Sequence, residues 1–160
     1  MADEEQAPAT DENNSPVIAP QRIYVKDVSF ETPNSPEIFT ARWEPEVSML
    51  MDSTDKDLGD DVYEVVLSFT VTIKVGDKTA YLAEVNQAGI FTLKGLTPEQ
   101  LHRTQHVFCL RFLHPYAVAA ITDMISKGGF PQFLMPPVNF NKRYKERYEN
   151  AEKVSEPEAS

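Results

Sequence analysis

The sequence predicts an α+β domain, with four antiparallel strands first and helices last. Two patterns support this class: apolar and polar residues alternate in segments up to about Gln87, and helical spacing appears only from Pro115 onward. The strands and helices do not alternate along the chain, which argues against a parallel sheet.

The chain of 160 residues is long enough to bury a core of its own. We expect the folded domain to cover residues 21–150. Residues 1–20 hold acids and prolines but no bases, and residues 151–160 are polar, so both ends are predicted to be disordered.

The alternation of apolar and polar side chains, in which odd and even positions face opposite sides of a sheet, locates four strands along the chain. Ile23 and Val25 share one parity and Val28 and Phe30 the other, which predicts a β-bulge at Lys26-Asp27. The second strand alternates apolar and polar residues between Trp43 and Asp52. The third, from Val62 to Ile73, is the clearest, and a turn at Gly76-Asp77 leads into its hairpin partner from Thr79 to Gln87.

A first helix is predicted to begin at Pro115 and to end at Gly128-Gly129. Its apolar residues cover nearly its whole circumference, more than one small sheet can cover, so this stripe predicts an oligomer interface. The stripe consists of Ala117, Ala120, Ile121, Met124 and Ile125. A second helix follows Pro136-Pro137, with aromatic residues every fourth position from Phe140.

The charge limits the classes of partner. The chain has 15 basic and 25 acidic residues, a net charge of −10, and is repelled by nucleic acid and anionic membranes. No apolar run is long enough to insert into a bilayer. The single Cys109 cannot form an internal disulfide, and the first residues lack a signal-peptide pattern, so we expect a cytoplasmic protein with basic or neutral partners.

No catalytic motif is present, so we expect a protein that is not an enzyme and needs no cofactor. His102, His106 and Cys109 are metal-ligand types at i, i+4 and i+7, which leaves a metal-dependent hydrolase as an alternative. The spacing lacks the glutamate of HExxH, and we expect no metal there. The acids from Asp52 to Asp61 lack the spacing of a calcium loop and predict a solvated loop.

One face of the predicted sheet is polar. Parity places Asp27, Ser29 and Glu31 together, and Leu82 with Glu84. This pattern suits either a merely solvated face or a docking site for a basic peptide with an apolar anchor.

Apolar side chains also gather near predicted loops, at residues 49–51, 90–93 and 130–135. Methionine and aromatic residues adapt to many partners, so these segments suit a peptide-binding groove. An ordinary core with oligomer contacts explains them equally well.

The chain resembles the SecB family of bacterial protein-export chaperones over about residues 21–141. The segments that match in order are Gln21–Glu31, Pro33-Asn34, Trp43–Val47, Asp60–Leu67, Glu84–Phe91, Pro115–Ala117, Gly129–Gln132 and Pro136–Phe140.

The resemblance implies a four-stranded, Greek-key-like sheet with helices on one face, assembled as a tetramer, a dimer of dimers. It implies an ATP-independent holdase that delivers unfolded preproteins to the motor ATPase SecA. The resemblance also implies that a basic, zinc-containing C-terminal tail of SecA docks at the matching positions, Asp27, Glu31, Leu82 and Glu84. The client groove implied by the resemblance runs beside the crossover loop and the last helix, with Tyr24, Trp43, Val47, Met49, Met51 and Tyr144 as candidates. A secretion chaperone for one dedicated partner is a further alternative.

Overall fold

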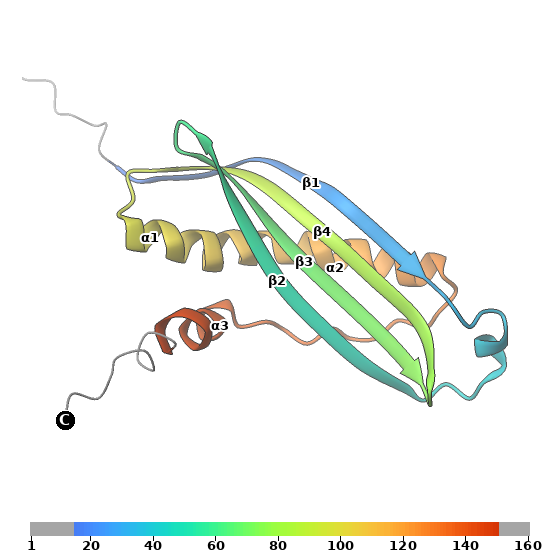
Figure 1. Ribbon diagram of the computed structural model, residues 1–160. Coiled ribbons are helices and arrows are strands. Elements are labelled where there is room, and N and C mark those ends of the chain that lie inside the picture. Colours follow the sequence, from blue (N-terminus) through green and yellow to red (C-terminus); the bar gives the residue numbers. More distant parts are fainter. Residues whose placement is uncertain (1–14, 151–160) are drawn as a thin grey trace, which may run out of the picture.

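An antiparallel sheet forms the frame of the computed structural model, which describes residues 15–150 (Figure 1). Its strands are β1 (Val17–Glu31), β2 (Pro45–Gly59), β3 (Val62–Val75) and β4 (Lys78–Lys94). They are arranged in the order β1-β4-β3-β2. The consecutive strands β2, β3 and β4 are joined as hairpins, and β1 lies on the outer side of β4. This Greek-key-like topology confirms the predicted fold class.

The strands are longer than the sequence pattern suggested. β1 begins at Val17, inside the segment expected to be an arm, because Val17 and Ile18 pair with the far end of β4. The predicted bulge is confirmed, since the β1–β4 register shifts between Val25 and Asp27. Residues 1–14 and 151–160, which hold the rest of the two predicted tails, lie outside the described residues.

The acidic segment before the long strand is mostly strand, so the predicted loop is wrong there. Asp52, Asp55 and Asp57 pair along β2 with residues of β3. Only Asp60 and Asp61 form the turn, with φ of 56° and 60°. Positive φ at both central residues matches the twist of a two-residue hairpin, and aspartate tolerates it better than most residues.

The main helix begins well before Pro115. α1 (Pro98–Arg103), the π-helical turn η3 (Thr104–Phe108) and α2 (Cys109–Lys127) follow without a break. A capping box starts the helix, in which the Thr97 hydroxyl accepts from the Gln100 amide and the Gln100 side chain accepts from the Thr97 amide. Pro115 therefore lies inside α2, where it forgoes one backbone hydrogen bond. The predicted end at Gly128-Gly129 is confirmed.

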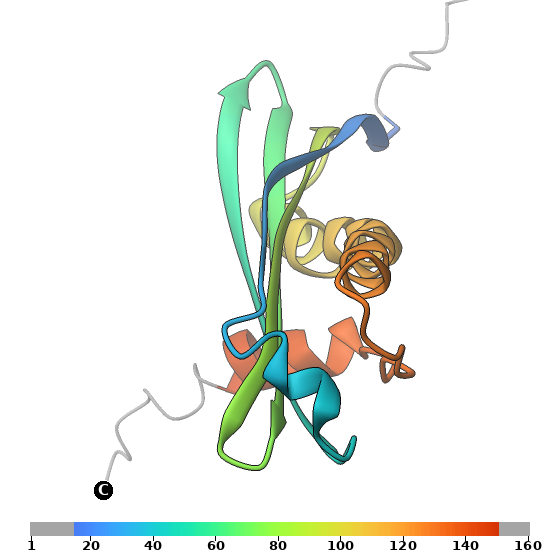
Figure 2. The same ribbon diagram turned by 90° about the vertical axis from the view of Figure 1, so that its right-hand side faces the viewer.

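Helix α2 packs along one face of the sheet (Figures 1 and 2). Side chains of that face and of the inner helix face are fully buried; they include Leu67, Val71, Tyr81, Val85, Phe91, Leu110, Leu113, Ala117, Ile121 and Ile125. This corrects the predicted oligomer stripe, because Ala117, Ile121 and Ile125 belong to the chain's own core. Phe91 and Leu93 are likewise core residues of β4 rather than loop surface. Of the predicted stripe, only Ala120 and Met124 remain half-buried.

The last helical segment packs against the edge strand β2, where its arginines contact Met51 and Asp52. It consists of α3 (Phe140–Tyr144) and the π-helical turn η4 (Lys145–Glu149), and we call residues 140–149 the C-terminal segment. Asn139 caps it by accepting from the Lys142 amide, after the coil that contains Pro136-Pro137, as predicted. Between β1 and β2 the chain forms a short 3-10 helix, η2 (Glu37–Thr40). No helix within residues 15–150 is long and apolar enough to cross a membrane.

Candidate functional site

The strand register brings the four predicted docking residues onto one face. Glu31 lies opposite Leu82, Ser29 opposite Glu84 and Asp27 opposite Asn86, with no register shift between them. Directly opposed residues of antiparallel strands point to the same side, so Asp27, Glu31, Leu82 and Glu84 share a face. The residues that alternate with them on β4, Ala83 and Val85, are buried on the helix side. We call this set on the side away from α2 the acidic face.

The carboxylates of the acidic face are available to a partner. Within residues 15–150, Asp27, Glu31 and Glu84 form no ion pair. Glu64, further along the same side, differs, because it pairs with Lys26 at 2.8 Å and accepts from the Tyr24 hydroxyl. These hydrogen bonds lower the pKa of Glu64 and raise that of Tyr24 to about 12. Three carboxylates without an ion pair among residues 15–150 therefore share a face with Leu82.

Leu50, which the sequence pattern groups with Met49 and Met51 as a candidate for a peptide-binding groove, lies on the side of the acidic face instead. It pairs with Thr70, which pairs in turn with Glu84, and Leu50 is 70% exposed. Leu50 is unusual in the sequence, because an apolar residue stands there where the apolar–polar alternation of the strand predicts a polar one.

Four of the predicted client residues lie on the opposite, helix side. Val47, Met49 and Met51 pair with Ile73, Val71 and Phe69, which are core residues, yet Val47 is exposed and both methionines are half-buried. Trp43 lies 5.9 Å from Phe130, ring centre to ring centre. We call Trp43, Val47, Met49 and Met51 the apolar edge. Nearby, Phe39 is 51% exposed and Leu134, in the coil before α3, is 96% exposed.

The other two predicted client residues are not part of this edge. Tyr24 pairs with Ala88 and bonds to Glu64, which puts it on the side of the acidic face. Tyr144 is buried, and its hydroxyl lies 2.7 Å from Nδ1 of His102. The register shift at Lys26 accounts for Tyr24, because a bulge changes which parity faces the core.

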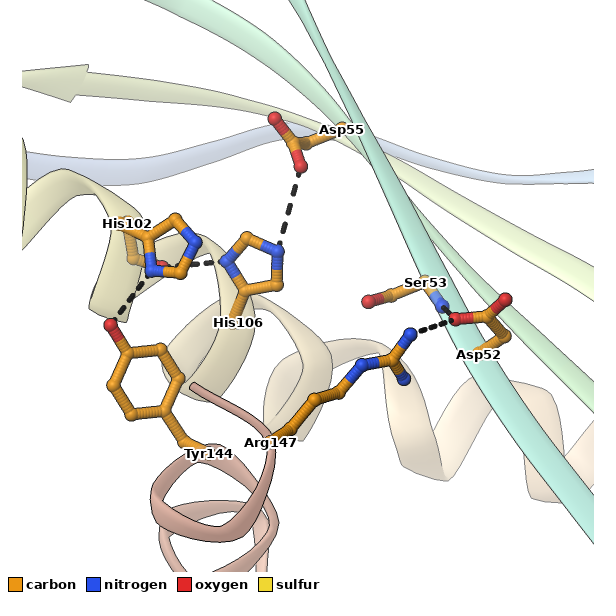
Figure 3. Close-up of polar contacts among 7 residues, drawn as sticks. All are labelled: Asp52, Ser53, Asp55, His102, His106, Tyr144 and Arg147. Carbon is orange, nitrogen blue, oxygen red and sulfur yellow. Dashed lines mark hydrogen bonds and ion pairs between the residues drawn. The ribbon is translucent and has the colours of Figure 1, made fainter. Parts of the chain in front are cut away.

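His102 and His106 face the C-terminal segment, whereas Cys109 is buried in the core (Figure 3 shows the two histidines). Nδ1 of His106 donates to the His102 carbonyl at 2.8 Å, and Nε2 lies 3.6 Å from an Asp55 oxygen. Burial raises the pKa of the Cys109 thiol to about 12, so a thiolate ligand is disfavoured. Within residues 15–150, no three potential ligand side chains are grouped to hold a metal ion.

The outer side of the main helix carries an aromatic stripe, Phe108, Phe112 and Tyr116, with successive ring centres 6.3 and 6.0 Å apart. Phe108 is 39% and Tyr116 48% exposed, and with Arg111 and Pro115 the stripe lines a shallow hollow. The stripe was not predicted, although aromatic residues at every fourth position (108, 112 and 116) are a visible signal in the sequence.

Known proteins support a family assignment. The family model "Preprotein translocase subunit SecB" matches residues 11–151. "Protein-export protein SecB" of Methylococcus capsulatus is 43% identical over 150 residues, covering 92% of this chain and 97% of that protein. The protein of the same name from Marinobacter nauticus is 42% identical, covering 99% of this chain and 96% of that protein. The one from Hahella chejuensis is 48% identical, covering 82% of each.

A solved structure shares the fold. The Mycobacterium tuberculosis SecB-like chaperone Rv1957, in complex with a peptide of the HigA1 antitoxin, superposes with a TM-score of 0.63 at 12% identity, covering 76% of this chain and 91% of that one. The family model matches residues 11–151, a range that includes every position of the acidic face and the apolar edge. The chain therefore belongs to the SecB family of protein-export chaperones.

Proposed function

We propose that this chain is a cytoplasmic, ATP-independent holdase that binds unfolded preproteins at the apolar edge and passes them to SecA, which docks at the acidic face. One observation supports both halves of the proposal: the two surfaces lie on opposite faces of a single sheet. A client on one face leaves the other free, so both partners can be bound at once. Neither task needs catalysis or a cofactor.

The acidic face suits a basic partner such as the C-terminal tail of SecA. Its three carboxylates have no internal ion pair among the described residues, so each can meet a cation without breaking a contact. Leu82 is half-buried among them and offers an apolar contact of about 1–3 kcal/mol if a partner covers it. Complementary charge mainly fixes orientation and accelerates association.

The apolar edge suits an extended, unfolded client. Its side chains project from an edge strand, and methionine adapts its shape to many partners. Because β2 ends the sheet, its backbone can also form hydrogen bonds with an added strand. Such contacts favour apolar segments with little regard for their exact sequence, which fits many clients better than one dedicated partner.

The aromatic stripe suits a second copy of the chain. It is an exposed row of apolar rings in the middle of the longest helix, and such a row is unfavourable in water unless another surface covers it. We propose that it forms the centre of a homotetramer, in place of the core residues Ala117, Ile121 and Ile125.

The holdase function is tested by light scattering of several unrelated, slowly folding preproteins without ATP. The wild type is expected to suppress their aggregation. Val47→Ser with Met49→Ser should weaken suppression, whereas Leu50→Ser, on the same strand but the other side, should leave it intact. Equal loss in both variants, or none in either, would contradict the apolar edge as the client site. Suppression for only one client would favour a dedicated chaperone.

A further inference from the structure

All three histidines of the sequence contact the C-terminal segment. The His102 ring lies 5.5 Å from the Tyr144 ring and 4.7 Å from the Tyr148 ring. The His106 ring lies 4.9 Å from Tyr148, and the His114 ring 5.6 Å from Phe140. The surface on which the last helical segment rests is thus built from the side chains that change charge nearest neutral pH.

The contact is closely packed at its centre (Figure 3). The rings of His102 and His106 are 4.2 Å apart, and His106 is only 8% exposed. The Tyr144 hydroxyl and Nδ1 of His102 share a hydrogen bond of 2.7 Å. Both helices are wound as π-turns here, η3 and η4, an arrangement often found at functional positions.

Charged groups reach this centre from each element around it. β2 contributes Asp55, 3.6 Å from His106, and Asp52, which pairs with Arg147 at 3.1 Å. The helix itself contributes Arg103, paired with Glu149 at 3.3 Å. The C-terminal segment contributes Arg143, which adds positive charge near His106 and donates to the Met51 carbonyl at 3.4 Å. The charge of Asp55 therefore favours a proton on His106, whereas the positive charges of Arg143 and of protonated His102 oppose it.

A proton on His106 or His114 is unfavourable while the segment is seated. Burial is the main reason that the pKa of His106 is lowered, and the positive charges of His102 and Arg143 add to it. The hydrogen bond to the His102 carbonyl and the charge of Asp55 act in the opposite direction and raise it. Burial also lowers the pKa of His114, whose contacts are the rings of Phe69 and Phe140 and whose Nε2 is buried without a hydrogen bond. Two charged imidazoles at the spacing of His102 and His106 would also repel each other.

We infer that the C-terminal segment is a proton-operated latch, seated on η3 and β2 while the imidazoles beneath it are neutral and released when they take up protons. A group with a lowered pKa in the seated state binds fewer protons there than in the released state. Seating is therefore complete above the ordinary histidine pKa, about 6.5, and weakens as the pH falls below it.

Release would uncover part of β2. The segment covers the backbone of Met51, and the buried hydroxyl of Ser53 has no hydrogen bond while the segment is seated. Opening would give that hydroxyl to water and free the β2 backbone at and beyond Met51, so the client surface would lengthen along the edge strand through backbone hydrogen bonds. This last consequence rests on the proposed function, whereas the latch itself does not.

Hydrogen exchange measured by mass spectrometry tests the latch on the full chain. Protection factors of peptides from residues 140–149, corrected for the intrinsic rate, are compared at about pH 7.5 and about pH 5.5. At the lower pH a free imidazole is mostly protonated, so protection is expected to fall about tenfold for each histidine that seating keeps neutral. Peptides of β4 serve as the internal reference and should keep their protection.

Two variants sharpen the test. His102→Gln with His106→Gln keeps polar side chains that cannot become charged, and should remove the part of the fall that His106 causes, about tenfold, while leaving the part that His114 causes. Asp55→Asn removes the one carboxylate that favours a charged His106, so it should enlarge the fall, and it lies on a partly exposed strand position where misfolding is not expected. Asp77→Asn, the same change in the exposed turn between β3 and β4, is the matched control and should behave as the wild type.

Three results would each overturn the latch: constant protection of residues 140–149 between the two pH values, an equal fall in the glutamine variant, or a parallel fall in β4. Client binding is measured separately at both pH values. If the segment opens without any change in client affinity, the latch stands and the extension of the client surface beyond Met51 is wrong.

Discussion

Glu31 and Leu82 lie directly opposite each other on β1 and β4, so a carboxylate and an apolar side chain occupy neighbouring positions of the acidic face. Two strands that are distant in sequence thus build one mixed surface. Its charges act at long range and steer a basic partner, while its leucine acts only on contact. The two components can be separated by experiment.

The first prediction concerns the charges. Asp27→Ala with Glu84→Lys should reduce SecA affinity beyond detection. The double change removes two of the three carboxylates of the acidic face and adds a lysine that repels the basic tail. Client holding and assembly should be unchanged, since both side chains lie on the side away from α2. Titration of SecA beside an aggregation assay measures the two activities. Asp61→Asn with Asp77→Lys, in exposed turns, changes the net charge by the same three units and controls for charge alone. A parallel loss of both activities would contradict the two-surface arrangement.

The second prediction concerns salt. At about 0.5 M salt the screening length is only a few ångströms, so SecA docking should weaken steadily as salt is added. Client binding should persist, because apolar contact is not screened. Leu82→Ala should lower SecA affinity without changing the slope of its salt dependence. Complete release of an unfolded client by salt would instead indicate an electrostatic client site.

Much of the sheet could be predicted because a strand has the shortest side-chain period. The parity change at Lys26 located the bulge, and parity grouped Glu31 with Asp27 on β1 and Leu82 with Glu84 on β4, while the family resemblance joined the two groups into one site. The spacing from Phe140 to Tyr144 likewise identified a helix, and both residues are buried. In each case the pattern is local, so neighbouring residues suffice to define it.

Features that depend on packing between elements could not be predicted in this way. Pro115 resembled a helix start, but the capping box of Thr97 and Gln100 starts the helix earlier and neighbouring turns tolerate the proline. A helix that is apolar nearly all round does not reveal which side meets its own sheet, so Ile121 was assigned to the wrong surface. The C-terminal segment contacts histidines more than 25 residues away in the sequence.

The third prediction concerns His114. Its Nε2 is buried without a partner, and burial lowers its pKa, so the unfolded chain binds a proton more readily than the folded one. The free energy of unfolding should therefore fall as the pH drops below about 6.5. His114→Phe keeps the aromatic contacts with Phe69 and Phe140 and should stabilise the chain by about 1 kcal/mol at neutral pH. Urea unfolding at several pH values measures both effects. If His114→Phe left the pH dependence of the unfolding free energy unchanged, the prediction would be wrong and His106 would be its source.

The last prediction separates the core of the chain from its assembly. Native mass of the wild type should be near four times the 18.1 kDa of one chain. Phe108→Asp with Tyr116→Asp places charges on the exposed aromatic stripe, where a single chain tolerates them in water but a second copy could not cover them without burying them unpaired.

Circular dichroism should show that this double variant remains folded, and its native mass should be lower than that of the wild-type tetramer. Ile121→Asp is the matched comparison one turn further along the same helix. Ile121 is fully buried against the sheet, so its charge should unfold the chain itself, at a cost of about 3–5 kcal/mol or more. If the stripe variant kept the native mass while remaining folded, another surface would hold the tetramer together. If Ile121→Asp gave a folded chain of lower mass, the helix would face its partner on the side that the core now occupies.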